Sequence, residues 1–334
     1  MKRTSEIEKK LDELLEKYEL IGQSTESYLE GLLYSNPLGY WDYIQTEALL
    51  SLQCPRTDFP DELIFIMYHQ VTELYFKLSL HELEQIAYNG KNISKAGQDL
   101  GWLEELDSGY FERRLKRVNA YFEALTKSFD IMVQGMEPEQ FIKFRMALLP
   151  ASGFQSAQYR MIEICSTDLI NIVSLSKRKE LQGATIEHQF EHIYWKEGAT
   201  ELASGKKTLT LKEFERKYTD QLLGLAKRFE NRNMWQKFVE LNEKGLVTEE
   251  LKNELRQLDV NVNINWPLVH YKSAVRYLSS DKKDDDTAAT GGTNWQKYLP
   301  PRFQKRIFFP TLWSEKEKEE WGKSWVDDVK KSLG

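Results

Sequence analysis

Two of the five histidines in this 334-residue chain stand where an imidazole could do redox or proton chemistry. His69 lies in the segment FIMYHQVTELYFK, where helical spacing puts it on one face with Phe65, Thr72 and Phe76. An ionisable ring among aromatic side chains is an unusual choice for a protein core, although a hydrogen-bonded core histidine would give the same pattern. The local sequence therefore leaves both a catalytic and a structural role open for His69.

His270 is the second of these histidines. Pro267 suits the first turn of a helix, so His270 should lie near the start of that helix, one turn after Trp266. A haem iron needs a neutral imidazole that is held rigidly and whose other ring nitrogen has a hydrogen-bonding partner. A histidine on a helix meets the first requirement, but one such residue is also compatible with a structural role.

His188 and His192 are four residues apart and would share a helix face, with Glu187 and Glu191 beside them. Such a set could bind a divalent metal, and a non-haem metal protein is one alternative. No third ligand at a characteristic spacing is evident, and the segment is strongly polar. A solvated surface is therefore the favoured interpretation, as it is for His81, which lies among charges.

One turn could bind an anionic ligand. Residues 144–160 indicate a helix end, a tight Pro-Ala-Ser-Gly turn and a new helix. The turn can present a hydroxyl and backbone N–H groups, and Arg145 just before it could hold a carboxylate through two parallel hydrogen bonds. A structural turn with a surface arginine is the alternative. The serine-hydrolase, phosphate-loop and dinucleotide-binding motifs are missing from the chain.

The elements that must position these residues are helical almost throughout. Alternation with a period of two is nearly absent, and glycine and proline are scarce, at 18 and 9 residues. We expect an N-terminal helical arm over 1–39, with an apolar stripe to bury on a partner, and a single catalytic domain over 40–334. The expected helices cover about 5–20, 25–35, 40–52, 60–88, 108–133, 137–148, 154–177, 210–230, 233–244, 248–258, 266–280 and 315–331. The polar stretch 279–289 is expected to be a surface loop.

Composition excludes several classes of protein. The net charge of −6 argues against a nucleic-acid partner. The N-terminus has no apolar signal region, and no stretch is apolar enough to span a membrane. Two isolated cysteines, Cys54 and Cys165, fit reduced thiols in a reducing compartment. We therefore expect a cytoplasmic protein.

Three blocks of sequence together resemble the tryptophan 2,3-dioxygenase family of haem enzymes, and their order along the chain is that of the family. The first runs from Tyr40-Trp41-Asp42-Tyr43 through Asp61-Glu62-Leu63-Ile64-Phe65 to His69-Gln70-Val71-Thr72-Glu73. The second joins Phe144-Arg145 to Pro150-Ala151-Ser152-Gly153-Phe154-Gln155. The third contains Trp266, His270, Thr290-Gly291-Gly292 and Phe308-Phe309-Pro310-Thr311-Leu312-Trp313. The resemblance covers residues 40–313 and implies an all-α fold with haem b between helices of a bundle core.

The resemblance implies a role for each matching residue on the haem side. His270 matches the proximal iron ligand, and Trp266 matches a tryptophan that orients this ligand. Ser152 and Gly153 match the turn over the distal face of the haem.

On the substrate side, His69 matches a distal histidine close to the indole N–H, and Phe65 an aromatic wall of the indole pocket. Arg145 matches the carboxylate clamp and Thr290 a hydroxyl that holds the amino-acid end. Phe141 and Ser152 are also expected to bind substrate.

The implied reaction inserts O2 across the indole C2–C3 bond of L-tryptophan to give N-formylkynurenine. The resemblance also implies a homotetramer, in which Tyr40 and Tyr43 reach a neighbouring subunit's active site.

The chain departs from the family near the expected site. Pro267 follows Trp266 where the family usually has arginine, the loop 279–289 is longer and acidic, and Thr293-Asn294-Trp295 replaces Ser-Ser-Gly. These changes leave two alternatives open: a dioxygenase of the same fold acting on another indole derivative, and a helical haem-binding protein without turnover.

Overall fold

The computed structural model describes residues 4–95, 97–199, 206–278 and 301–322, and the chain divides into two compact units. One unit combines Met1–Gln53 with Lys91–Trp102, and the other combines Cys54–Gly90 with Leu103–Gly334. Each is described by itself.

The first unit carries short helices and the one sheet found in the described residues. The helices are α1 (Ser5–Leu20), α2 (Thr25–Tyr34), α3 (Tyr40–Ile44) and α4 (Thr46–Leu50). The helix expected over 40–52 is therefore wrong as one element, because Gln45 between α3 and α4 takes the left-handed conformation at φ 55°. Strands β1 (Lys91–Ile93) and β2 (Asp99–Trp102) form an antiparallel hairpin that the sequence analysis did not predict.

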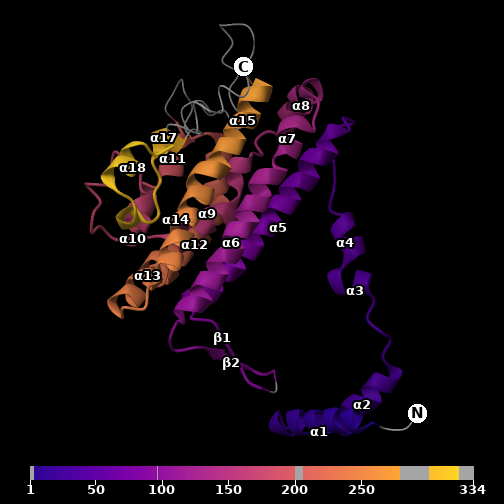
Figure 1. The fold of residues 1–334 in the computed structure, drawn as a ribbon. Coiled ribbons are helices and arrows are strands. Elements are labelled where there is room, and N and C mark those ends of the chain that lie inside the picture. Colours follow the sequence, from indigo (N-terminus) through magenta and orange to yellow (C-terminus); the bar gives the residue numbers. More distant parts are fainter. Residues whose placement is uncertain (1–3, 96, 200–205, 279–300, 323–334) are drawn as a thin grey trace. The chain divides into compact units, whose positions relative to one another are not determined.

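The second unit is a helical bundle built around the long helix α5 (Asp61–Ala87). Helix α5 packs against α6 (Ser108–Ser128) and α9 (Ala157–Ser166), and α6 packs against α14 (Glu249–Val260). Figure 1 shows α5, α6, α14 and α15 (Trp266–Leu278) running lengthwise together. The other elements are α7 (Asp130–Gln134), α8 (Pro138–Arg145), η1 (Met146–Leu148), η2 (Gly153–Gln155), η3 (Leu169–Ile172), α10 (Ile186–Glu191), α11 (Tyr194–Gly198), α12 (Leu209–Phe229), α13 (Met234–Glu243), η4 (Asn261–Asn265), α17 (Pro301–Gln304), η5 (Pro310–Leu312) and α18 (Glu315–Glu319).

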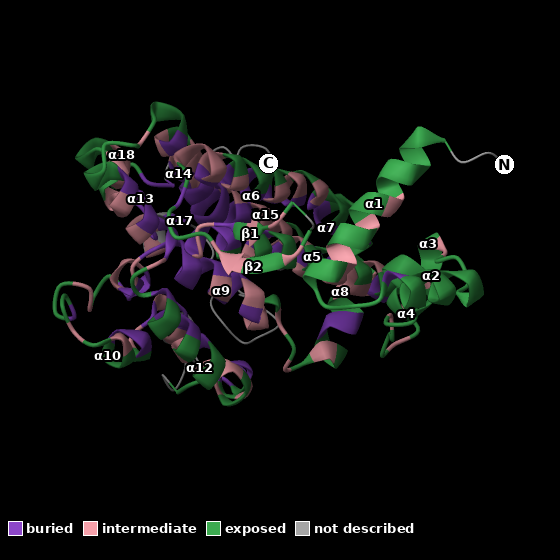
Figure 2. Ribbon diagram, turned by 90° about the horizontal axis from the view of Figure 1, so that it is seen from below, coloured by how far each residue is buried: buried purple, intermediate pink, exposed green. Residues whose placement is uncertain are grey.

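The all-α expectation is confirmed, and the boundaries of α5 were predicted nearly to the residue. Asn89 and Gly90, the expected C-cap signal, both have positive φ, and the Gly90 N–H donates to the Gln85 carbonyl at 2.8 Å. Buried residues gather along the helices of this unit (Figure 2). The interior is apolar, with six phenylalanines among the largest fully buried side chains. No helix in the described part of the chain is both long and apolar enough to cross a bilayer.

Three expected helices are wrong in extent. The helix predicted over 154–177 ends at Ser166, because the backbone of Thr167 is extended. The Thr167 hydroxyl donates to the Phe308 carbonyl, which holds the residue in this conformation. The helix predicted over 108–133 is interrupted at Phe129, between α6 and α7. The last predicted helix, over 315–331, is α18 alone in the described residues.

Candidate active site

His69 lies in the middle of α5 with one ring nitrogen already engaged. Its Nδ1 atom is 2.7 Å from the carbonyl oxygen of Phe65, one turn earlier. A carbonyl oxygen only accepts hydrogen bonds, so Nδ1 carries the proton and Nε2 keeps its lone pair. Desolvation lowers the pKa of His69, which favours the neutral ring. His69 therefore offers a fixed acceptor nitrogen in a largely apolar setting.

Aromatic side chains from three helices form a series of ring contacts that begins at His69. The ring of Phe65 lies with its centroid 4.1 Å from the His69 ring and 5.7 Å from that of Phe144. Phe141 lies 6.2 Å from Phe65 and 4.7 Å from Tyr277 on α15, also between ring centroids. The structure thus brings Phe65 and Phe141, both expected in the substrate pocket, to the same side of the bundle as His69.

The turn at 150–155 approaches His69 at its unprotonated nitrogen. A Cβ atom added at Gly153 would lie 4.0 Å from Nε2 of His69. Ser152 and Gln155 cap the short helix η2 reciprocally: the Ser152 hydroxyl accepts from the Phe154 N–H, and the Gln155 side chain accepts from the Ser152 N–H. This capping leaves the hydroxyl proton of Ser152 free to donate.

The same turn is anchored to α12. The Gln155 amide donates to the carbonyl of Thr210 at 3.1 Å, and the Thr210 hydroxyl donates to the carbonyl of Pro150 at 3.0 Å. The turn is thus held at both ends by one helical residue, which keeps Ser152 and Gly153 in place beside His69.

Arg145 ends α8 directly after Phe144, in the aromatic cluster beside His69. Its exposed fraction is 6%, and burial lowers the pKa of its guanidinium. The sequence alternative of a surface arginine is therefore wrong. A buried guanidinium next to aromatic side chains suits an anionic group on an otherwise apolar ligand.

His270 repeats the arrangement of His69 on helix α15. Its Nδ1 atom is 2.9 Å from the carbonyl oxygen of Trp266, so Nε2 again keeps the lone pair. The pKa of His270 is lowered to about 4, mainly by desolvation and to a smaller extent by the positive charge that a protonated His69 would carry, so the two rings lie within electrostatic reach of each other. The chain thus provides two neutral imidazoles, each fixed by its own helix.

The ring of His270 packs against two aromatic side chains that also contact each other. Trp266 lies edge-on to it, with centroids 4.5 Å apart and planes inclined by 73°, and the centroid of Phe129 is also 4.5 Å away. Phe129 and Phe76 in turn contact Trp266, at 5.4 and 5.6 Å between centroids. The sequence analysis missed Phe129, because only packing brings the junction of α6 and α7 against α15.

A π-helix, η4, precedes α15 and was not predicted, since the sequence indicated two separate helices there. The hydroxyl of Tyr159 on α9 donates to the Val262 carbonyl inside η4 at 2.8 Å. Pro267 is the second residue of α15. Because proline has no backbone N–H to donate, it is tolerated at this point, where the hydrogen-bonding pattern changes from π-helix to α-helix. The π-helix and Tyr159 therefore set the rotation of α15 and the direction of His270.

The C-terminal aromatic block, residues 308–313, is hydrogen-bonded to the end of α14, just before η4 and α15. The buried carboxylate of Asp259, two residues before η4, accepts from the N–H groups of Phe308 and Phe309 and from the indole of Trp313, at 2.9 to 3.1 Å. Burial raises the pKa of Asp259 to about 6. The block Phe308-Phe309-Pro310-Thr311-Leu312-Trp313 thus supports the start of the helix that carries His270.

The remaining expected site residues are not part of this cluster as described. Tyr40 and Tyr43 lie in the first unit and are largely exposed. Thr290 lies outside the described residues. His188 and His192 lie on and directly after α10, and His81 is exposed on α5.

Comparisons with known proteins agree with the sequence resemblance. The profile of the family described as "Tryptophan 2,3-dioxygenase" matches residues 32–298. A tryptophan 2,3-dioxygenase of Ruegeria sp. (strain TM1040) is 37% identical over 130 residues, which are 39% of this chain and 42% of that protein. The one of Anaeromyxobacter sp. (strain K) is 38% identical over 130 residues, 39% of this chain and 44% of that protein.

A third relative, the tryptophan 2,3-dioxygenase of Shewanella woodyi, is 33% identical over 156 residues, 45% of this chain and 50% of that protein. Each pairwise match therefore spans half or less of the relative's length, while the family profile spans most of this chain. On the strength of that profile match, the chain belongs to the tryptophan 2,3-dioxygenase family.

Proposed function

We propose that this protein inserts both atoms of O2 across the indole C2–C3 bond of L-tryptophan, giving N-formylkynurenine, with haem b bound through His270. The observation that carries the proposal is the pair of neutral histidines, each with Nδ1 bonded to a backbone carbonyl and Nε2 left as a lone pair. The family is haem-dependent in general, and its members provide this chemistry through iron.

His270 fits the requirements of an axial haem ligand. Its ring is neutral over the physiological pH range, its tautomer is set by the Trp266 carbonyl, and its orientation is restricted by Trp266 and Phe129. Bound haem would supply a ferrous iron that binds and activates O2, a step no amino-acid side chain performs. Phe65 beside His69, and Phe129 and Trp266 beside His270, offer aromatic surface that would suit a flat, apolar macrocycle and would exclude water around it.

The residues around His69 suit an amphipathic indole substrate. Phe65 and Phe141 would contact the faces of the indole, and Nε2 of His69 would accept a hydrogen bond from the indole N–H. Arg145 would bind the carboxylate, with the Ser152 hydroxyl donating beside it. Thr290, by resemblance alone, would hold the amino group. Together these contacts would hold the indole in one orientation, and such positioning converts binding energy into rate.

We also place this function in a homotetramer. Five apolar side chains on one face of α5, each 41% to 48% exposed, form a stripe, which we call the α5 stripe: Leu63, Met67, Val71, Leu74 and Leu78. The first unit exposes apolar side chains on α2 and α3 to a larger fraction, among them Leu33, Tyr40 and Tyr43. Contiguous exposed apolar surface of this kind is typical of protein interfaces. A second copy of the chain, bringing Tyr40 and Tyr43 to the site, accounts for both surfaces.

The direct test is turnover by purified, haem-loaded protein under isotopically labelled O2. We expect L-tryptophan to gain both atoms of one O2 molecule, as measured by mass spectrometry, and His270→Ala to lose both stable haem binding and product. Haem binding with turnover of another indole, and none of L-tryptophan, would replace the proposed substrate. A His270→Ala protein with full haem content and an unchanged absorption spectrum would remove His270 as the ligand.

A further inference from the structure

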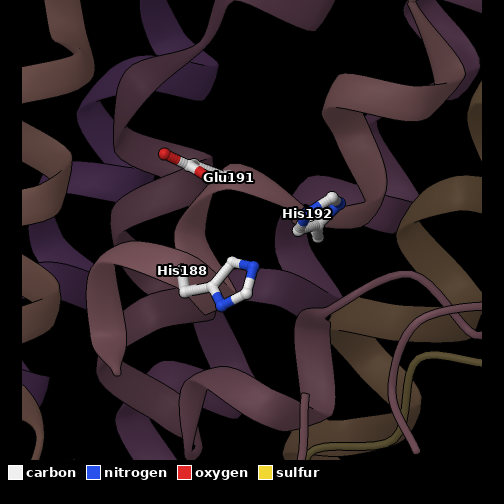
Figure 3. Close-up of side chains that lie close together, drawn as sticks. All are labelled: His188, Glu191 and His192. Atoms are coloured by element: carbon white, nitrogen blue, oxygen red, sulfur yellow. The ribbon is translucent and has the colours of Figure 1, made fainter. Parts of the chain in front are cut away.

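A second group of potential metal ligands lies on α10, outside the candidate active site. His188, Glu191 and His192, which we call the α10 cluster, each offer one donor atom, and these atoms all lie within 4.8 Å of one another (Figure 3). The two imidazole centroids are 5.7 Å apart, with ring planes inclined by 59°. His188 and Glu191 are exposed and His192 is half-buried, so all three can be reached from solvent. Of the two glutamates that the sequence analysis named beside these histidines, Glu191 is the one that the structure groups with them.

The backbone that carries the cluster is held at both ends. The Thr185 hydroxyl accepts from the N–H of His188 at the start of α10. At the other end, the N–H of His192 donates to the Gln189 carbonyl, and its own carbonyl accepts from the N–H of Ser174 at 2.9 Å. Because the backbone is fixed, only side-chain torsions must change to bring the three donors to a common point.

A buried glutamine anchors the helix from beneath. Gln189 is buried, and its amide donates to the carbonyls of Leu181 and Ala184, both at 3.2 Å. Glu187 forms an ion pair with Lys227 on α12 at 2.6 Å, which joins the two helices. This pairing removes Glu187 as a ligand, and it distinguishes Glu187 from Glu191.

An ion pair lies in the segment that precedes α10. The carboxylate of Glu180 forms an ion pair with Lys177 at 2.8 Å. This hydrogen bond lowers the pKa of Glu180, and the charges of His192 and His188 lower it further, so the carboxylate lies near both rings. Because Lys177 offsets the charge of Glu180, this pair leaves the cation to be held by the α10 cluster itself.

We propose that His188, Glu191 and His192 bind one transition-metal dication of the zinc type, with water completing the coordination. Two imidazoles and one carboxylate are a common zinc donor set, whereas magnesium and calcium prefer oxygen ligands alone. Zinc–nitrogen bonds of about 2.0–2.1 Å require the donors to approach more closely than they do here. Exposed side chains can make that movement by changing rotamers, so we expect micromolar affinity. The site shares no residue with the candidate active site and does not depend on the function proposed above.

The test uses the haem-loaded protein without a histidine tag, so that neither His270 nor a tag competes for metal. Zinc is titrated against a chromogenic chelator, and the same titration is repeated with magnesium. We expect one equivalent of zinc to bind, with no binding of magnesium. His188→Gln and His192→Gln should each weaken zinc binding by more than about tenfold, since even the loss of an indirect partner of a metal ligand costs that much. Glu191→Gln should weaken it less than either histidine variant.

The matched control is His81→Gln, which removes an exposed histidine on α5. This variant should bind zinc like the unchanged protein, and all variants should keep their haem absorption spectrum and helical circular dichroism. No saturable zinc binding below the millimolar range would overturn the proposal. Equal zinc binding by the His188→Gln, His192→Gln and His81→Gln proteins would overturn it too, because the metal would then lie elsewhere.

Discussion

Nε2 of His69 faces Gly153, and a Cβ atom at position 153 would lie 4.0 Å from that nitrogen. The glycine belongs to a turn that α12 holds in place, so the space above Nε2 is a property of the fold. If this space receives the indole N–H, it must admit a donor to about 2.9 Å from Nε2. The contact between these two residues therefore links the packing of the turn to substrate binding.

Gly153→Leu should exclude substrate without unfolding the protein. Position 153 is exposed, and substitutions at such positions usually change the free energy of unfolding by less than about 0.5 kcal/mol. We expect turnover of L-tryptophan to fall by more than about tenfold, which is about 1.4 kcal/mol of lost transition-state binding, with haem content retained. Gly224→Leu is the control, since a Cβ there meets nothing within 4 Å. Unchanged turnover in the Gly153→Leu protein would place the substrate elsewhere.

Arg145→Leu should discriminate between substrates with and without a carboxylate. Losing one partner of a buried charge pair costs about 2–5 kcal/mol, so L-tryptophan turnover should fall well over tenfold. Tryptamine lacks the carboxylate and should be affected far less. The ratio of kcat/KM for the two substrates is the measurement. Equal losses for both would show that Arg145 only supports the fold.

His69→Ser should slow the reaction without stopping it. The indole N–H is a weak acid, and activation of O2 is assigned to the iron, so Nε2 serves to position the ring. A positioning hydrogen bond is worth about 0.5–1.5 kcal/mol, which corresponds to roughly an order of magnitude in rate. Turnover per haem should be measured together with the melting temperature. A complete loss of turnover with haem intact would instead make His69 an obligatory base.

The haem-free protein should lose stability in acid through His270. The pKa of this ring is lowered from 6.5 to about 4 in the fold, so between these pH values the unfolded chain binds more protons. The free energy of unfolding should therefore fall as pH drops from 6.5 to 4, by up to about 3 kcal/mol from this residue. Urea unfolding of the unchanged protein and of His270→Gln across this range isolates the contribution.

The unchanged protein is compared with His270→Gln because Asp259 also makes stability depend on pH in this range. Its pKa is raised to about 6, so its contribution to stability changes in the opposite direction: it is present at low pH and is lost as pH rises through 6. Both proteins share this effect, and it cancels in the difference. A difference that stays constant with pH would contradict the prediction for His270.

A charge in the middle of the α5 stripe should break the assembly. Val71→Glu places a carboxylate between Met67 and Leu74, and a buried unpaired charge is strongly unfavourable at an interface. We expect light scattering to show a smaller oligomer at micromolar concentration, with helical content unchanged. Lys212→Glu, at an exposed position of α12, is the control. A monomeric unchanged protein, or a Val71→Glu protein of undiminished mass, would reject the stripe as an interface.

The sequence by itself determined the helical class, the main helices of the bundle and the residue types of the site. Helix α5 could be predicted because its apolar periodicity, its acidic start at Asp61 and its stop at Asn89-Gly90 are all local signals. The positions of His69 and His270 on helices followed from the same kind of local information. Their engagement with the carbonyls of Phe65 and Trp266 is also local, because each partner lies one turn earlier on the same helix.

Only the tertiary structure decided which residues meet. Phe129 reaches His270, Gly153 reaches His69, and Tyr159 holds the π-helix, because side chains far apart in sequence are packed into one core. The predicted helix over 154–177 ends early for the same reason: Thr167 forms a hydrogen bond to Phe308, a partner that no local pattern reveals. Local periodicity reports the preference of a segment for helix, whereas the free energy gained from long-range contacts decides where that helix stops and which way its side chains point.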